Sequence, residues 1–486
     1  MTNRAVRRAM TVDAPAPTGP SRVLAALVVL LLLVLAACSA GPRTDPYADL
    51  LGSWAGRIEV PDRPLDIGIR FTDAGGLGGT IDIPVQGIVE SPLGEVRLAD
   101  GIVSFTVPEV PGNASFRGRL DGSGPAATIR GEFRQGGQTL RMSLTRGTVA
   151  PLPRPQEPRP PFPYRSEQAR YRSGDVELAG TLTVPEGDGP FTAVLLLTGS
   201  GPQDRDETIF EHKPFLLLAD TLTRAGYAVL RTDDRGVGGS GGNLATAGYD
   251  GLTDDALAGV EYLKGRPDVD PARIGLLGHS EGGYIAPLAA QRSGAVAFVI
   301  MMAGPAVSGE EVLALQNRLL FEVAGAPPDQ VDAQVAYVHE MAGLLRAEDY
   351  PAAETLTRRR IEQQSATLPE DRRPGPQEIE AQARAATTPT RRSFVTYDPG
   401  PALDALTVPV LACYGSKDLQ VPATQNDPAL RDRFADHPDA TVRTFPGLNH
   451  LMQPAKTGSL DEYAQTETTI SPEVLDLITD WLRARY

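Results

Sequence analysis

The chain has 486 residues and a formal net charge of −15, from 46 Lys and Arg against 61 Asp and Glu. This length is sufficient for about three domains with a large core. Two cysteines exclude a fold held by several disulfides and a cysteine-rich structural zinc site. The acidic balance argues against a nucleic-acid partner, because phosphate binding favours a basic surface.

The N-terminal segment has the pattern of a secretion signal. Four arginines precede an uncharged apolar run from Val23 to Ala37. As a helix this run is about 22 Å long, short of the roughly 30 Å hydrocarbon core of a membrane, so a signal peptide over residues 1–37 fits better than a spanning helix. Leu35-Ala36-Ala37-Cys38 resembles the lipobox of bacterial lipoproteins. The resemblance implies that Cys38 is lipidated and anchors an extracytoplasmic protein to a membrane of the cell envelope; an ordinary signal peptide is the alternative.

Residues 38–48 are short and polar, as in a tether, and residues 49–150 alternate apolar and polar positions with a period of two. Ile67, Ile69 and Phe71 are one such series, and the run 102–107 is another. Glycine-rich turns separate these runs every 8–12 residues or so, which is typical of a small antiparallel barrel or sandwich. The segment contains no histidine, so we expect it to be structural or to bind a ligand.

Residues 151–164 form a proline-rich linker, and residues 165–486 change to alternating strands and helices. Seven prolines in PLPRPQEPRPPFP favour an extended, semi-rigid boundary. The alternation that follows predicts a mostly parallel sheet covered by helices on both faces. Between about 308 and 395 the strands stop and leucine and valine recur at helical spacing, which predicts a helical cap over the ligand edge of the sheet. The predicted strands are 176–184, 191–197, 228–232, 273–278, 297–303, 408–414 and 441–445, and the predicted helices of the sheet domain are 213–225, 253–264, 282–291 and 472–485.

Two serines match the pattern G-x-S-x-G, Ser280 in Gly278-His279-Ser280-Glu281-Gly282 and Ser240 in Gly238-Gly239-Ser240-Gly241-Gly242. Ser280 lies between an apolar strand and an alanine-rich helix, where a sharp turn would project its hydroxyl. No helix directly follows Ser240. The glycine-rich residues around Ser240 also fit the dinucleotide pattern G-x-G-x-x-G. Because that pattern should open a helix directly, the lack of a helix argues against a nucleotide site as well. Ser280 is therefore the predicted nucleophile.

A serine nucleophile needs a base, and the base needs an orienting carboxylate. Of the five histidines, only His450 follows a late strand in a loop at its C-terminal end, where open parallel sheets place their sites. Asp418 ends the turn after the apolar strand 408–414 and is the predicted acid, with Asp427 and Asp404 as alternatives. Cys413 lies within that strand and is expected to be a small core residue.

The oxyanion of the tetrahedral intermediate needs two backbone donors. Glu281 follows the nucleophile at the start of a helix and would supply one N–H group. The loop Thr198-Gly199-Ser200-Gly201 follows a buried strand and would supply the other. We place that donor at Ser200, with Gly201 as the second choice.

Three motifs together resemble the α/β-hydrolase superfamily, and within it bacterial carboxylesterases with a helical cap: residues 199–206 (GSGPQDRD), 233–238 (DDRGVG) and 278–283 (GHSEGG). The resemblance covers about two thirds of the chain, from about Tyr164 to Tyr486. It implies a serine carboxylesterase in which Ser280, His450 and Asp418 form the triad, with a small acyl ester as substrate and neither cofactor nor metal. The histidine that often opens the oxyanion loop is Thr198 here, so the geometry of that loop is an open question.

Two other readings remain open. One is a serine peptidase or aminopeptidase with the same triad, which would need a carboxylate near the substrate amine. The other is an envelope lipoprotein in which residues 49–149 recognise a ligand. Asp204, Arg205 and Asp206 either order the oxyanion loop or contact the substrate.

Overall fold

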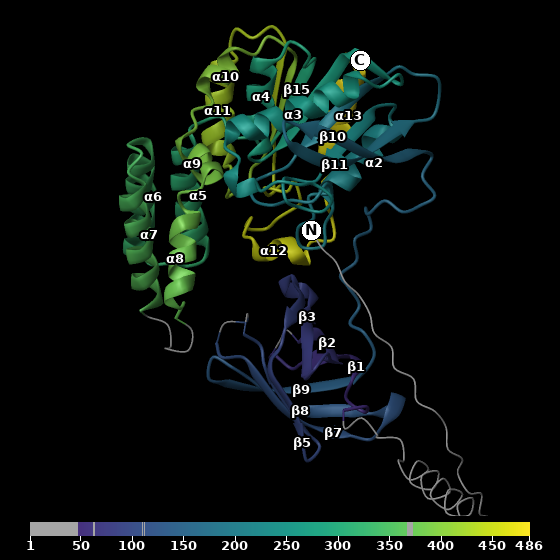
Figure 1. Ribbon diagram of the computed structural model, residues 1–486, viewed down its shortest axis with the longest axis vertical. Helices are drawn as coiled ribbons and strands as arrows, with labels where there is room; N and C mark the ends of the chain where they lie inside the picture. Colours follow the sequence, from purple (N-terminus) through teal and green to yellow (C-terminus); the bar gives the residue numbers. More distant parts are fainter. Residues whose placement is uncertain (1–46, 62–63, 109, 111, 367–372) are drawn as a thin grey trace, which may run out of the picture. The chain divides into compact units, whose positions relative to one another are not determined.

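The computed structural model describes residues 47–61, 64–108, 110, 112–366 and 373–486. The predicted signal peptide and Cys38 lie outside these residues. The chain forms two compact units, and Figure 1 labels their elements. The first contains the described residues up to Asp82 together with Glu90–Val149, and the second contains Ile83–Val89 and Ala150–Tyr486.

The first unit is built on an antiparallel sheet of nine strands in the order β4-β3-β2-β1-β9-β8-β7-β6-β5. The predicted alternation is present: in β6, Val103 and Phe105 are buried while their neighbours are partly exposed. This confirms an all-β N-terminal region. The strands are β1 (Gly52–Ile58), β2 (Leu65–Asp73), β3 (Leu77–Ile83), β4 (Ile88–Pro92), β5 (Gly94–Ala99), β6 (Ile102–Thr106), β7 (Ser115–Asp121), β8 (Thr128–Gln135) and β9 (Gln138–Arg146).

The second unit is built on an eight-stranded mixed sheet in the order β10-β11-β13-β12-β14-β15-β16-β17. The six strands from β12 onward are parallel where they pair, as predicted, but β10 and β11 are antiparallel to their neighbours. The sequence did not predict β10, because its polar sequence YRSEQARYRS lacks an apolar run. The strands are β10 (Tyr164–Ser173), β11 (Val176–Pro185), β12 (Phe191–Leu197), β13 (Ala228–Thr232), β14 (Val269–His279), β15 (Phe298–Met302), β16 (Val410–Gly415) and β17 (Ala440–Phe445).

Helices cover both faces of this sheet because the inner strands alternate between two apolar surfaces. In β12, Ala193 and Leu195 belong to one core cluster, and Val194 and Leu196 to the other. The first cluster includes residues of α3 (Tyr249–Lys264) and α4 (Gly282–Arg292), and the second includes residues of α2 (Pro214–Arg224) and α13 (Pro472–Arg483). Cys413 is a buried free thiol in the second cluster, as its apolar strand predicted.

The order of the strands determines where a site can form. After β12 the chain continues to β13 on one side and then returns to β14 on the other. Ligands of open α/β sheets bind at such a reversal, outside the carboxyl ends of the strands. The loop after β12 and the turn after β14 both lie at this position.

Helices α5 to α9 lie between β15 and β16 in the chain, within the range predicted to be helical. Their shared core includes Leu313, Val338, Met341 and Val395. Figure 1 shows α5 to α8 (green) gathered beside the sheet. These elements are α5 (Gly309–Val323), α6 (Pro328–Arg346), α7 (Tyr350–Ser365), α8 (Pro376–Ala385) and α9 (Pro389–Thr396), and α10 (Gly400–Asp404), α11 (Ala423–Arg433) and α12 (Asp461–Gln465) follow. Within the described ranges, no helix is long and apolar enough to cross a membrane.

The proline-rich segment is docked on the second unit. Arg154 is 8% exposed and donates hydrogen bonds to the carbonyl oxygens of Phe210 and Ala464, both at 2.9 Å, and of Thr466 at 3.1 Å. Gln156 donates to the Ile470 carbonyl at 2.8 Å. The segment therefore belongs structurally with the sheet that follows it.

Candidate active site

Ser280 lies in the sharp turn between β14 and α4. Its φ angle is +51°, a left-handed conformation that costs a non-glycine residue about 1–3 kcal/mol. Its N–H group donates to the Met302 carbonyl of β15 at 3.0 Å. A Cβ atom at Gly278 would lie 2.0 Å from the Gly282 carbonyl oxygen, and one at Gly282 would lie 2.3 Å from the Leu197 carbonyl oxygen. Both glycines are therefore needed for the turn to close.

His450 and Asp418 form a buried pair, with 2.8 Å between His450 Nδ1 and Asp418 Oδ2. Their side chains are 5% and 0% exposed. The other Asp418 oxygen accepts the N–H groups of Gln420 and Val421, both at 2.8 Å, so the carboxylate is held in one orientation. Asp418 and His450 lie in the loops after the parallel strands β16 and β17, at the same edge of the sheet as Ser280.

The alternative acids are occupied elsewhere. Asp427 pairs with Arg431 at 2.5 Å and accepts a hydrogen bond from Thr444 at 2.6 Å. Asp404 pairs with Arg433 at 2.5 Å. The two ion pairs are exposed, and none of the three contacts involves a histidine.

Ser280 is partly exposed, and across the described chain no hydrogen bond joins its hydroxyl to His450. The link between the turn and the His450 loop is made by the neighbouring residue, His279. The rings of His279 and His450 have centroids 5.0 Å apart. The nucleophile candidate and the base candidate are thus brought together through a second histidine.

The loop after β12 contacts the nucleophile turn. A Cβ atom at Gly199 would lie 3.3 Å from Ser280 Cβ. Asp234 holds both ends of the loop, because its carboxylate accepts the Thr198 hydroxyl at 2.8 Å and the Gln203 N–H at 2.9 Å. Thr198, whose type departs from the usual histidine, therefore anchors this loop.

The predicted oxyanion donors are not used internally. Ser200 and Gly201 are exposed, and Gly201 has a φ of +92°. Among the hydrogen bonds of the described residues, none is donated by the N–H groups of Ser200, Gly201 or Glu281. All three donors remain available to a bound oxygen, and the geometry does not separate Ser200 from Gly201.

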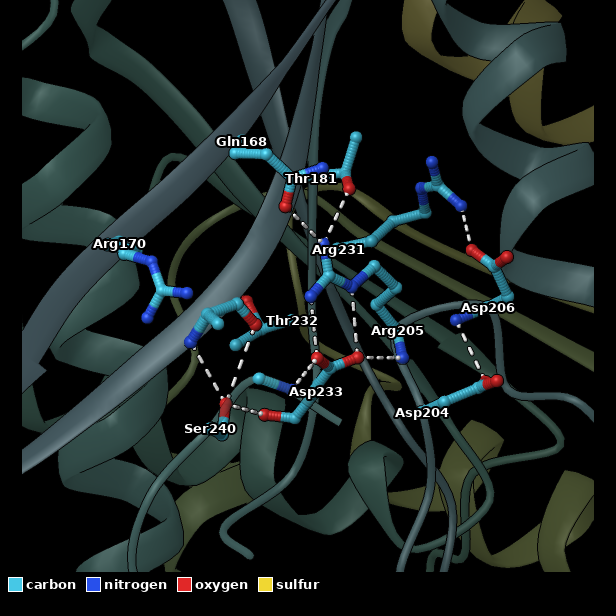
Figure 2. Close-up of polar contacts among 12 residues, drawn as sticks. Gln168, Arg170, Thr181, Asp204, Arg205, Asp206, Arg231, Thr232, Asp233 and Ser240 are labelled. Carbon is cyan, nitrogen blue, oxygen red and sulfur yellow. Dashed lines mark hydrogen bonds and ion pairs between the residues drawn. The ribbon is translucent and has the colours of Figure 1, made fainter. Parts of the chain in front are cut away.

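Asp204, Arg205 and Asp206 order the loop after β12 (Figure 2). The Arg205 guanidinium donates to both oxygens of Asp233, at 2.9 and 2.6 Å, and Asp206 pairs with Arg231. Asp204 accepts the backbone N–H of Asp206 at 3.1 Å. Burial raises the pKa of Asp233. The hydrogen bonds from the Arg205 side chain and from two backbone N–H groups lower this pKa by more than burial raises it, so the net pKa is below the ordinary value.

Ser240, the second match to the motif, is held in the same network (Figure 2). It is 9% exposed. Its hydroxyl donates to the Asp233 carbonyl at 2.8 Å and accepts the Ala179 N–H at 2.9 Å. Its oxygen is therefore occupied by backbone contacts.

A cavity lies behind the oxyanion loop and is lined by both apolar and acidic side chains. Its apolar lining includes Leu195, Leu252 and Ile285, and its acidic lining includes Asp234 and Glu281. Burial raises the pKa of Asp234 to about 7 despite its hydrogen bonds. Burial raises the pKa of Glu281 to about 7 as well, and the charge of Asp234 adds to this shift.

Sequence reasoning missed Glu207 and the contacts of His279. Glu207 is 3% exposed and accepts both the Gly199 N–H at 2.7 Å and a contact from His279 at 2.9 Å. These residues are 72 positions apart, and no local pattern indicates such a pair. The one feature of the sequence that points to Glu207 is its position directly after the charged motif of residues 199–206.

Comparison with known proteins identifies related hydrolases. Residues 212–339 match the family described as "Serine aminopeptidase, S33". Esterase EstD of Thermotoga maritima is 31% identical over 305 residues, which are 63% of this chain. The chain spans 65% of the length of that relative.

Two solved structures also align with the chain. An esterase of Pyrococcus furiosus aligns with a TM-score of 0.41 and 16% identity, covering 66% of this chain and 91% of that one. The proline iminopeptidase of Mycobacterium smegmatis aligns with a TM-score of 0.40 and 20% identity, covering 65% and 98%.

The family match and the Thermotoga relative support an α/β-hydrolase enzyme. The mixed sheet with its strand-turn-helix at Ser280 agrees with that class.

Proposed function

We propose that the protein is a serine hydrolase that cleaves carboxylic esters. The observation that carries this proposal is the buried His450–Asp418 pair at the same sheet edge as the strained serine turn. EstD, an esterase by name, supports esters as the substrate class. The predicted donors of an oxyanion hole are free at the same place.

In the proposed mechanism, His450 Nε2 removes the proton of the Ser280 hydroxyl while Oγ attacks the acyl carbonyl carbon. The carbonyl π electrons move to oxygen, and the N–H groups of Glu281 and Ser200 stabilise that oxyanion. Asp418 keeps the Nδ1 proton of His450 in place, so that Nε2 faces the serine. The intermediate collapses to an acyl-enzyme, and the leaving alcohol takes the proton from His450. Water then attacks in the same way and releases the acid.

A peptidase or aminopeptidase that uses the same triad is the second candidate. The family match carries the description of a serine aminopeptidase. The carboxylates of Asp234 and Glu281 line a cavity beside the nucleophile turn, as recognition of a substrate amine would require. An assay with ester and anilide substrates distinguishes the two candidates.

The test uses purified residues 39–486 with p-nitrophenyl esters of increasing acyl length and with aminoacyl-p-nitroanilides. We expect ester turnover that Ser280→Ala abolishes. Turnover of the anilides alone would favour the peptidase, and full activity in Ser280→Ala, Asp418→Asn and His450→Ala would refute the site.

We further propose that the mature protein is a lipoprotein anchored through Cys38 and that helices α5 to α9 shape the acyl pocket. The apolar run 23–37 and the lipobox pattern support the anchor. Detergent-phase partitioning of wild type and of Cys38→Ala, expressed in a bacterium that lipidates proteins, tests it. Equal partitioning would contradict the anchor.

A further inference from the structure

A second buried histidine–carboxylate pair lies beside the proposed triad. His279 Nδ1 is 2.9 Å from Glu207 Oε1, and the two side chains are 5% and 4% exposed. His279 ends β14 immediately before Ser280, and Glu207 lies in the segment between β12 and α2. The mechanism proposed above assigns neither side chain a role.

Both ring nitrogens of His279 face hydrogen-bond acceptors. Nδ1 faces the Glu207 carboxylate, and Nε2 faces the His450 carbonyl oxygen at 3.2 Å. A neutral imidazole has one N–H group and can satisfy only one of these contacts. For both contacts to be hydrogen bonds, the pair must hold one more proton, so that one proton lies between Nδ1 and Oε1 and another is on Nε2.

The same carboxylate oxygen holds the oxyanion loop. Glu207 Oε1 accepts the Gly199 N–H at 2.7 Å, and Gly199 directly precedes Ser200. Three parts of the site thus meet at this pair: the loop with the donor, the turn with the nucleophile, and the loop with the base.

We propose that Glu207 and His279 are positioning residues for the hydrolase reaction: the proton they share fixes the oxyanion loop and the His450 loop against the Ser280 turn. This inference rests on the proposed function. Neither residue is proposed to touch the substrate. Their effect is on the transition state, because a displaced donor stabilises the oxyanion much less than a correctly placed one.

The charged surroundings of the pair favour keeping the proton. Burial alone lowers the pKa of His279, but the charge and hydrogen bond of Glu207, the His450 carbonyl and the charge of Asp418 raise it above the ordinary value overall. The other titratable groups that act on the pair are the His450 ring, 5.0 Å from the His279 ring, and Asp234, whose carboxylate repels that of Glu207. The second Glu207 oxygen is buried without a partner in the described structure.

Loss of one proton at alkaline pH leaves a neutral imidazole, which keeps its N–H at Nδ1 because the Glu207 carboxylate is the stronger acceptor. The Nε2 lone pair then faces the His450 carbonyl oxygen, a repulsive contact that would displace the His450 loop from the turn. We therefore expect kcat to fall at alkaline pH while KM changes little.

The test compares Glu207→Gln, Glu207→Leu and His279→Phe with wild type in kcat, KM and pH profile. His437→Phe is the matched control, because His437 lies between α11 and β17 and accepts only the Asp439 N–H at 3.1 Å among the described contacts. We expect Glu207→Leu and His279→Phe to lose about 10²-fold in kcat, with KM within about threefold. The control should keep the kcat of wild type.

Glu207→Gln keeps the shape and an acceptor oxygen, so it remains informative if the other variants fail to fold. Without the carboxylate charge, His279 should lose its second proton about one to three pH units earlier, and the alkaline limit of kcat should shift down accordingly. A wild-type alkaline limit in Glu207→Gln, or a wild-type kcat with raised KM in the other two variants, would overturn the proposal.

Failure of the proposed function can be told apart from failure of this inference. If wild type hydrolyses no ester, the rate at which a fluorophosphonate labels Ser280 replaces kcat, because this reaction also needs the oxyanion donors. A shifted pH dependence of labelling in Glu207→Gln would support the pair even then. An unshifted one, or no labelling of wild type, would refute it.

Discussion

The two G-x-S-x-G segments of the second unit match the same pattern but place their serines in opposite environments. Ser280 has a left-handed backbone, is partly exposed and is followed at once by α4. Ser240 is 9% exposed, and its hydroxyl is held by the backbone of Asp233 and Ala179. The motif itself therefore carries little information. The strand before a serine and the helix after it determine whether its hydroxyl is free.

Substituting each serine by alanine tests this contrast most directly. Ser280→Ala should lower kcat by at least about 10⁴-fold, since no other group can form the acyl-enzyme. Ser240→Ala should keep kcat within a few-fold but lower the free energy of unfolding by about 1–3 kcal/mol, because two buried backbone groups lose their partner. Ester kinetics and urea unfolding of both variants give the result. Loss of activity in a stable Ser240→Ala would contradict the contrast.

Two of the three candidate acids, Asp418 and Asp427, allow the same kind of comparison. Asp418→Asn should reduce kcat by about 10³–10⁴-fold, because the amide no longer holds the Nδ1 proton of His450. Asp427→Asn weakens contacts with Arg431 and Thr444, neither of which involves a histidine, and should leave kcat near wild type. The kinetics of both variants at pH 8 decide between the carboxylates. An equal loss in both would refute Asp418 as the orienting acid.

Gly278 of the first motif and Gly241, which directly follows Ser240 in the second, should differ in what they tolerate. A Cβ atom at Gly278 would lie 2.0 Å from the Gly282 carbonyl oxygen, whereas one at Gly241 would have its nearest neighbour at 3.6 Å. Gly278→Ala should therefore lose about 3 kcal/mol of stability or more, and Gly241→Ala should change it by less than about 1 kcal/mol. Thermal unfolding with circular dichroism measures both. Similar melting temperatures would show that the turn relaxes more easily than the described geometry implies.

Glu281, the residue after Ser280, gives the smallest expected effect. Glu281 is buried with a pKa raised from 4.5 to about 7, so the unfolded chain releases this proton first and stability falls as pH rises from about 5 to 7. Glu281→Gln removes that cost while keeping its backbone N–H. The variant should gain up to about 3 kcal/mol over wild type between pH 4 and pH 8. Urea unfolding at both pH values checks the sign, and a pH-independent difference would contradict it.

The sequence predicted most of the second unit because its elements have strong local signals. The bounds predicted for β12 and β13 are the bounds observed. β10 was missed, since a strand at the sheet edge has no apolar run to reveal it. Ser280, His450 and Asp418 were predicted from strand ends and chain order, and the structure brings His450 and Asp418 into contact. The contact between Glu207 and His279 could not be predicted, because it joins positions 72 residues apart.

The docked proline-rich segment determines where the second unit can be cut from the chain. Arg154 ties it to carbonyl oxygens of Phe210, Ala464 and Thr466, which a chain beginning at Tyr164 would leave without this partner. A chain shortened to the continuous part of the second unit should therefore start at Ala150, and it would lack Ile83–Val89 of the same unit. The proline-rich segment that marks a boundary in the sequence is tied to the second unit by Arg154 and Gln156, and the usable junction lies on its N-terminal side.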